Sequence, residues 1–175
     1  MQNNVSLRLA KRIWEVVEKE FESGELFEKV SPITKELLRF WFCEPFISQR
    51  QFNFHKGQKQ SILNIIYLHE VLKINNVLEI YEQVAPDLLL ESDLFGAKET
   101  HNSLKESRYD LPKYLVKMAT GTGKTWVMHA LLIWQILNAK NEEEKSGRFT
   151  KNFLIVAPGL IVYDRLLDAY KGRLS

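Results

Sequence analysis

The residues best suited to chemistry lie in the stretch 118–125, which reads Met-Ala-Thr-Gly-Thr-Gly-Lys-Thr. Its two glycines allow backbone conformations in which successive N–H groups point toward an anion. Its lysine can supply a positive charge to the β- and γ-phosphates of a nucleotide, and the hydroxyl of its last threonine can bind Mg²⁺. The pattern predicts a phosphate-binding loop whose contacting residues are Gly121, Thr122, Gly123, Lys124 and Thr125.

The surroundings of this loop decide between a phosphate site and an ordinary turn. The general pattern starts with glycine where this sequence has Met118, so a glycine-containing turn with an incidental lysine is the alternative. Residues 114–118 are predicted to form a short strand before the loop, and residues 126–137 a helix after it. A strand before and a helix after favour the phosphate loop, because the helix adds the positive end of its dipole. Lys124 is then the expected catalytic residue.

A second strand–helix pair follows the first. Residues 153–157 form an apolar run that Pro158 ends, and another helix is predicted from Leu160. The order strand, helix, strand, helix is typical of a parallel sheet with crossover helices. We therefore predict an α/β fold in which residues 111–175 are the start of an incomplete parallel-sheet domain.

The N-terminal part of the chain has a different pattern. Apolar residues at helical spacing predict a mainly helical region over residues 1–85, with Ser31 as the cap of one helix and Pro32 as its first residue. Residues 86–110 are polar and weakly periodic, so a loop or insertion is expected there. The apolar positions that carry the helical pattern are Leu9, Ile13, Val16, Val17, Phe21, Ile33, Leu37, Leu38, Trp41, Ile62, Ile65, Ile66 and Leu72.

Composition and charge limit the function only loosely. The 175 residues are 45% hydrophobic, and no unbroken apolar stretch, residues 130–134 included, is long enough for a membrane span. The N-terminus lacks the apolar core of a signal peptide, and the single cysteine excludes an internal disulfide, so we expect a cytoplasmic protein without a membrane partner. Residues 1–100 carry 12 basic and 15 acidic side chains, and residues 101–175 carry 12 and 7. The excess of basic side chains in residues 101–175 is weak support for a polyanionic ligand.

The motifs together resemble a known family. The stretch 118–125, with methionine first, resembles motif I of superfamily-two helicases and translocases, most closely that of the motor subunit of type III restriction enzymes and related DEAD/DEAH-box restriction helicases. Residues 153–162 resemble their motif Ia. Residues 54–62 resemble the stretch that carries an adenine-reading glutamine, and residues 30–38 resemble a leader segment. The resemblance covers about residues 30–165.

This resemblance implies the N-terminal part of an ATP-dependent DNA helicase or translocase with a RecA-like domain, using ATP and Mg²⁺. Gln58 would hydrogen-bond both the donor and the acceptor of the adenine edge and so select ATP. Motif Ia implies contacts to the DNA backbone by Pro158, Gly159 and Arg165. Duplex DNA and a methyltransferase (modification) subunit are the implied partners, and a downstream endonuclease is a further implied part.

One motif of these motors is missing. The acidic tetrapeptide Asp-Glu-x-[His/Asp], which holds Mg²⁺ and positions the attacking water, does not occur in this sequence. We therefore expect this chain by itself to be inactive as an ATP hydrolase. Two alternatives stay open: a P-loop kinase or ATPase without a nucleic-acid role, and a non-catalytic truncated remnant that acts as an interaction module.

Overall fold

The computed structural model describes residues 5–89, 113–141, 147–157, 159–160, 163–164 and 166–167. Within these ranges the elements are α1 (Val5–Ser23), α2 (Leu26–Lys29), α3 (Pro32–Phe42), α4 (Lys56–Ile66), the π-helical turn η1 (Tyr67–Val71), α5 (Val77–Val84), α6 (Pro86–Leu89) and α8 (Lys124–Asn141). The described part of the chain is thus mainly helical, as predicted for the N-terminal region.

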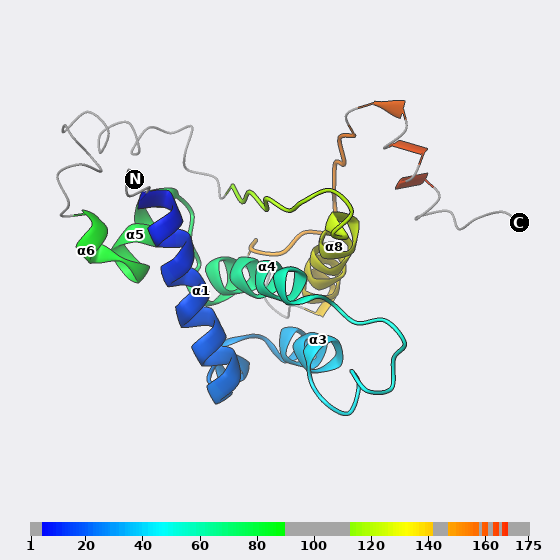
Figure 1. The fold of residues 1–175 in the computed structure, drawn as a ribbon, viewed down its shortest axis with the longest axis horizontal. Coiled ribbons are helices and arrows are strands. Elements are labelled where there is room, and N and C mark those ends of the chain that lie inside the picture. Colours follow the sequence, from blue (N-terminus) through cyan, green and yellow to red (C-terminus); the bar gives the residue numbers. More distant parts are fainter. Residues whose placement is uncertain are drawn as a thin grey trace, which may run out of the picture.

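Helix α4 is the centre of the arrangement. It packs against α1 on one side and α8 on the other, and α3 also contacts α8 (Figure 1). The helix that follows the glycine-rich loop is therefore anchored to the N-terminal helices, although the two are far apart in sequence. The buried core includes Leu9, Ile13, Val17, Leu38, Trp41, Ile62, Ile66, Val127, Ala130 and Trp134.

Local capping signals place the helices where the sequence predicts them. Ser31 caps α3, since its Oγ accepts a hydrogen bond from the Thr34 N–H at 3.1 Å, and Pro32 is the first helical residue. Helix α1 ends before Gly24, which has a φ of +86° that favours glycine. Both helix boundaries follow from the capping rules alone.

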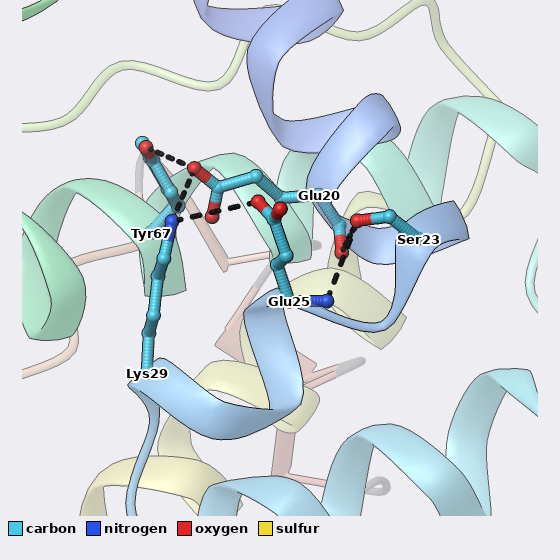
Figure 2. A network of polar contacts seen from close by, with 5 residues as sticks. All are labelled: Glu20, Ser23, Glu25, Lys29 and Tyr67. Carbon is cyan, nitrogen blue, oxygen red and sulfur yellow. Dashed lines mark hydrogen bonds and ion pairs between the residues drawn. The ribbon is translucent and has the colours of Figure 1, made fainter.

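A polar network joins the N-terminal helices to η1. The Tyr67 hydroxyl donates to Glu20 Oε1 at 3.0 Å, and Lys29 Nζ lies 2.7 Å from the same oxygen (Figure 2). Burial raises the pKa of Tyr67, and its hydrogen bond to Glu20 raises it further. The phenol therefore stays a donor, and α1, α2 and η1 are held at one point.

The predicted strands are the main difference between expectation and structure. No strand is present among the described residues, and segments 114–118 and 153–157 adopt no regular secondary structure. A strand exists only where a neighbouring chain segment completes its hydrogen-bond ladder, and an apolar pattern does not supply that partner. Leu115, Leu154 and Val156 are accordingly 92%, 90% and 81% exposed. The parallel sheet of the α/β prediction is not present in this part of the chain.

Two smaller expectations also need revision. Pro86–Leu89 form the short helix α6 with Leu88 buried, so the segment predicted as a loop starts with a helical turn; its remainder lies outside the described residues. The predicted helix 126–137 is apolar nearly all round, which predicts burial of both its tryptophans; Trp134 is 1% exposed, but Trp126 is 65% exposed. A membrane-crossing helix needs a long apolar run with few charges, and none of the described helices has one.

Candidate nucleotide-binding site

The glycine-rich loop has the backbone geometry that its sequence predicts. Gly121 and Gly123 have φ values of +80° and +75°, in the left-handed region that other residues rarely adopt. The turn is closed by the Thr122 hydroxyl, which donates to the Ala119 carbonyl at 2.7 Å. The loop leads directly into α8, whose first residue is Lys124. It therefore places the backbone N–H groups of the loop at the positive end of a helix.

The two side chains expected at the phosphates start this helix. Lys124 is exposed, and its ammonium donates to the Ala119 carbonyl at 2.8 Å, across the turn. Thr125 is exposed beside it. An ammonium has three donors, so Lys124 can replace this carbonyl contact with stronger, charge-assisted bonds to phosphate oxygens.

Gln58 connects α4 to the loop. Its side chain is buried, and its Oε1 accepts a hydrogen bond from the His55 N–H at 2.7 Å as part of a capping box. Its Nε2 donates to the carbonyls of Thr122 and Gly123 at 3.1 and 3.3 Å. The amide predicted to read adenine is thus engaged by the loop itself. Sequence reasoning missed this contact, although the spacing of His55 and Gln58 carries the signal for the cap.

The close approach of Gln58 explains one of the glycines. A Cβ placed on Gly123 would overlap Gln58 Nε2, whereas a Cβ on Gly121 would meet no atom within 4 Å. A side chain at Gly123 would therefore strain the backbone at this φ and also displace the Gln58 amide. Gly121 is required for its φ alone.

The residues expected to contact DNA are only partly described. Gly159 is exposed with a φ of +96°, and its N–H donates to the Ala157 carbonyl at 3.1 Å. Pro158 and Arg165 lie outside the described residues. A Cβ on Gly159 would meet no atom within 4 Å, so the space beside its backbone is open.

The donor set at the loop fits a nucleotide phosphate that brings its own Mg²⁺. Among the described residues no group of three or more His, Cys, Asp or Glu side chains could hold a metal ion. Mg²⁺ keeps several waters and is commonly bound through one or two protein oxygens together with substrate phosphates. The Thr125 hydroxyl would be one such oxygen.

Two cavities border α8. One of about 680 Å³ reaches Lys124 and Thr125 and lies between α8 and the segments 114–118 and 153–156. Another, of about 520 Å³, is lined by aromatic side chains that include Trp41, Phe54 and Trp126. Both are mainly apolar, so neither is itself a phosphate site. The larger one lies where a sheet formed by the two predicted strands would cover α8.

His69 is a half-buried titratable group beside this helix, with its ring against Trp134. Burial lowers its pKa, the nearby Arg148 guanidinium lowers it further, and a hydrogen bond to the Arg148 carbonyl opposes both. Glu70 and the Tyr114 hydroxyl are the other polar groups beside it. The imidazole is therefore neutral near pH 7.

This lowered pKa makes folding stability depend on pH. Because the pKa of His69 is lower in the folded than in the unfolded chain, the unfolded chain binds the proton first as the pH drops. The contribution of His69 to the free energy of unfolding should therefore be fully present above about pH 6.5 and decrease below it. Urea unfolding from pH 7.5 to 5.0 measures the slope. His69→Gln should flatten it over that range, and an equally steep slope in the variant would assign the dependence to another group.

A known protein family matches most of this chain. The model of the family described as type III restriction enzyme, res subunit, matches residues 51–175, and the chain belongs to this family. The matched region is a helicase-like ATPase domain of superfamily two, a class that generally depends on ATP and Mg²⁺. Res subunits act on DNA together with a modification subunit. The resemblance inferred from motif I is confirmed. No curated protein and no solved structure matches the chain.

Proposed function

We propose that residues 118–125 bind the phosphates of ATP, and that the chain carries the nucleotide-binding part of an ATP-dependent DNA helicase or translocase of the restriction type. One observation supports this above the others. Two glycines with positive φ lead into a helix that begins with Lys124, within the region matched by the restriction-enzyme family. Equilibrium binding of Mg·ATP to the chain, compared with its Lys124→Ala variant, tests the proposal.

Each residue of the loop has a distinct role in this proposal. The N–H groups around Gly121 and Gly123 bind phosphate oxygens, and the N-terminal end of α8 favours their negative charge. Lys124 leaves the Ala119 carbonyl and neutralises the terminal phosphates. Thr125 contributes its hydroxyl to Mg²⁺, which would supply charge neutralisation of the phosphates.

Two roles are proposed for Gln58, adenine recognition and support of the loop, and one experiment can distinguish them. We propose that it reads the adenine edge, as the resemblance implies, and its contacts show that it also supports the loop. We expect Gln58→Ala to weaken ATP binding about tenfold, the free energy of one or two hydrogen bonds. The preference for ATP over GTP should fall in the same variant. Competition of ATP and GTP for the site measures this ratio, and an equal loss for both nucleotides would contradict the adenine role.

Backbone contacts near Pro158 and Gly159, with Arg165, are the proposed link to duplex DNA. Arg165→Ala should weaken DNA binding about equally for all sequences, because phosphate contacts carry no sequence information. The slope of log affinity against log salt should decrease by about 0.9 for one lost phosphate contact. Fluorescence anisotropy with duplex DNA at several salt concentrations gives this slope. Lys151→Ala removes an exposed cation near the same segment; it is the control and should leave the slope unchanged.

The family match favours this function over the P-loop kinase alternative, because the matched family acts on DNA. The remnant that acts as an interaction module is not addressed by the match. It predicts partner binding by the helical region that is independent of ATP and DNA.

A further inference from the structure

The turn η1 brings two consecutive side chains to the same residue of α8. The His69 ring lies edge-to-face on the Trp134 ring, with 5.4 Å between their centroids. The next residue, Glu70, accepts a hydrogen bond from Trp134 Nε1 at 3.1 Å. Neighbouring residues of a regular α-helix point about 100° apart. A π-helical turn changes this spacing, and such turns occur frequently at functional sites.

Glu70 joins the start of α3 to the middle of α8. Its Oε2 accepts from the Thr34 hydroxyl at 2.7 Å as well as from Trp134, and its Oε1 accepts from the Ser31 N–H. Thr34 and Trp134 are fully buried. Asn138, one turn further along α8, donates to Thr34 Oγ1 at 3.0 Å. The carboxylate therefore accepts from three donors, two at the start of α3 and one in the middle of α8, and its loss would remove the acceptor that they share.

His69 joins the segments before the loop and after α8. Its Nε2 lies 2.8 Å from the Arg148 carbonyl, which can only accept, so Nε2 carries the proton. Its Nδ1 then accepts from the Tyr114 hydroxyl at 3.3 Å. Tyr114 precedes the glycine-rich loop, and Arg148 follows α8. One ring thus contacts the chain on both sides of the loop and its helix.

We propose that η1 is a positioning element of the phosphate loop, in which His69 holds the segment that enters the loop and Glu70 holds the helix that leaves it. This inference rests on the proposed nucleotide site. Because Lys124 and Thr125 are the first residues of α8, any shift of that helix moves both of them. Gln58 contacts the loop at Thr122 and Gly123, whereas a Cβ on Gly121 would meet no atom within 4 Å, so anchors at the two ends of the loop add to the support from Gln58. His69 and Glu70 act through Tyr114 and Trp134 and do not touch the nucleotide.

The test compares two substitutions in the same turn. Glu70→Gln keeps the size of the side chain but places an amide N–H₂ against donors from α3 and α8. Tyr67→Phe also removes a buried hydrogen bond from η1, but on the side that faces Glu20 of α1. Both variants should lower stability to urea. Only Glu70→Gln should affect the loop.

Two measurements on the whole chain follow the loop. Hydrogen exchange of the amides of residues 121–130 should be about tenfold faster in Glu70→Gln, and Mg·ATP affinity should be about tenfold lower, within the usual range of coupling between sites. Tyr67→Phe should leave both unchanged. Trp134→Phe, which loses the indole donor but keeps a ring, serves if Glu70→Gln does not fold, and we expect the same direction with about threefold changes.

Different outcomes would contradict the positioning role of η1 and the proposed nucleotide site. Equal changes in Glu70→Gln and Tyr67→Phe, or no change in exchange at residues 121–130 in Glu70→Gln, would overturn the positioning role. Failure of the unsubstituted chain to bind Mg·ATP, or unchanged affinity in Lys124→Ala, would instead overturn the nucleotide site. The exchange data would then decide alone whether η1 holds the loop.

Discussion

Replacing Lys124 with alanine should lower the affinity for Mg·ATP by about 100-fold, which in practice abolishes binding. Charge-assisted hydrogen bonds contribute roughly 2–3 kcal/mol, and Lys124 is the cation that starts the helix after the loop. The fold should be unaffected, because the side chain is exposed and its hydrogen bond among the described residues is to the Ala119 carbonyl within the loop. Isothermal titration with Mg·ATP measures the loss.

Two controls make the result specific. Lys117→Ala removes another exposed lysine just before the loop and should change the affinity by less than about twofold, since an exposed charge is largely screened. Urea unfolding of Lys124→Ala should match that of the unsubstituted chain. An unchanged Mg·ATP affinity in Lys124→Ala would show that the loop is not the phosphate site, independently of the result for Gln58→Ala.

The helices illustrate what local sequence can predict. Ser31 and Pro32 set the start of α3, and Gly24 follows the end of α1, because caps and turns depend on residues within a few positions of each other. The mainly helical N-terminal region follows from the same local pattern. The π-helical turn at Tyr67–Val71 does not, because it is selected by contacts with Trp134, Ser31 and other distant residues.

The strands show the opposite case. Residues 114–118 and 153–157 have the apolar character of buried strands, yet strand formation depends on a partner that a local pattern cannot specify. The family match indicates a RecA-like domain for residues 51–175, while the sheet itself is not among the described residues. The prediction named the family correctly, but the two segments that it expected as strands are not strands in the described part of the chain.

The candidate site also combines features that local sequence predicts with features that depend on distant contacts. The positive φ of Gly121 and Gly123 could be predicted, because glycine spacing before a Lys-Thr pair encodes a local backbone shape. The contact of Gln58 with Thr122 could not, because it joins positions 64 residues apart. This contact gives Gly123 a steric role that the motif alone does not contain.

Alanine substitutions at Gly121 and Gly123 test the steric role of Gly123, and we expect the second large effect at Gly123. Gly121→Ala and Gly123→Ala both place a side chain at positive φ, which costs about 1–2 kcal/mol. Only Gly123→Ala also displaces the buried amide of Gln58 from the carbonyls of Thr122 and Gly123, which adds about 1–3 kcal/mol. We expect Gly123→Ala to be the more destabilising of the two in urea unfolding, and to weaken Mg·ATP binding more.

A double-substitution cycle identifies the source of the difference. If Gln58 causes the excess cost at Gly123, that excess should disappear when Gly123→Ala is made together with Gln58→Ala, because the added Cβ then meets no amide. Gly121→Ala, whose Cβ would have open space, should cost the same in both backgrounds. Additive free energies at Gly123 would contradict the steric explanation and leave strain at φ +75° as the sole reason for glycine there. Loss of the excess would establish that α4, through Gln58, shapes the phosphate loop from a helix far away in the sequence.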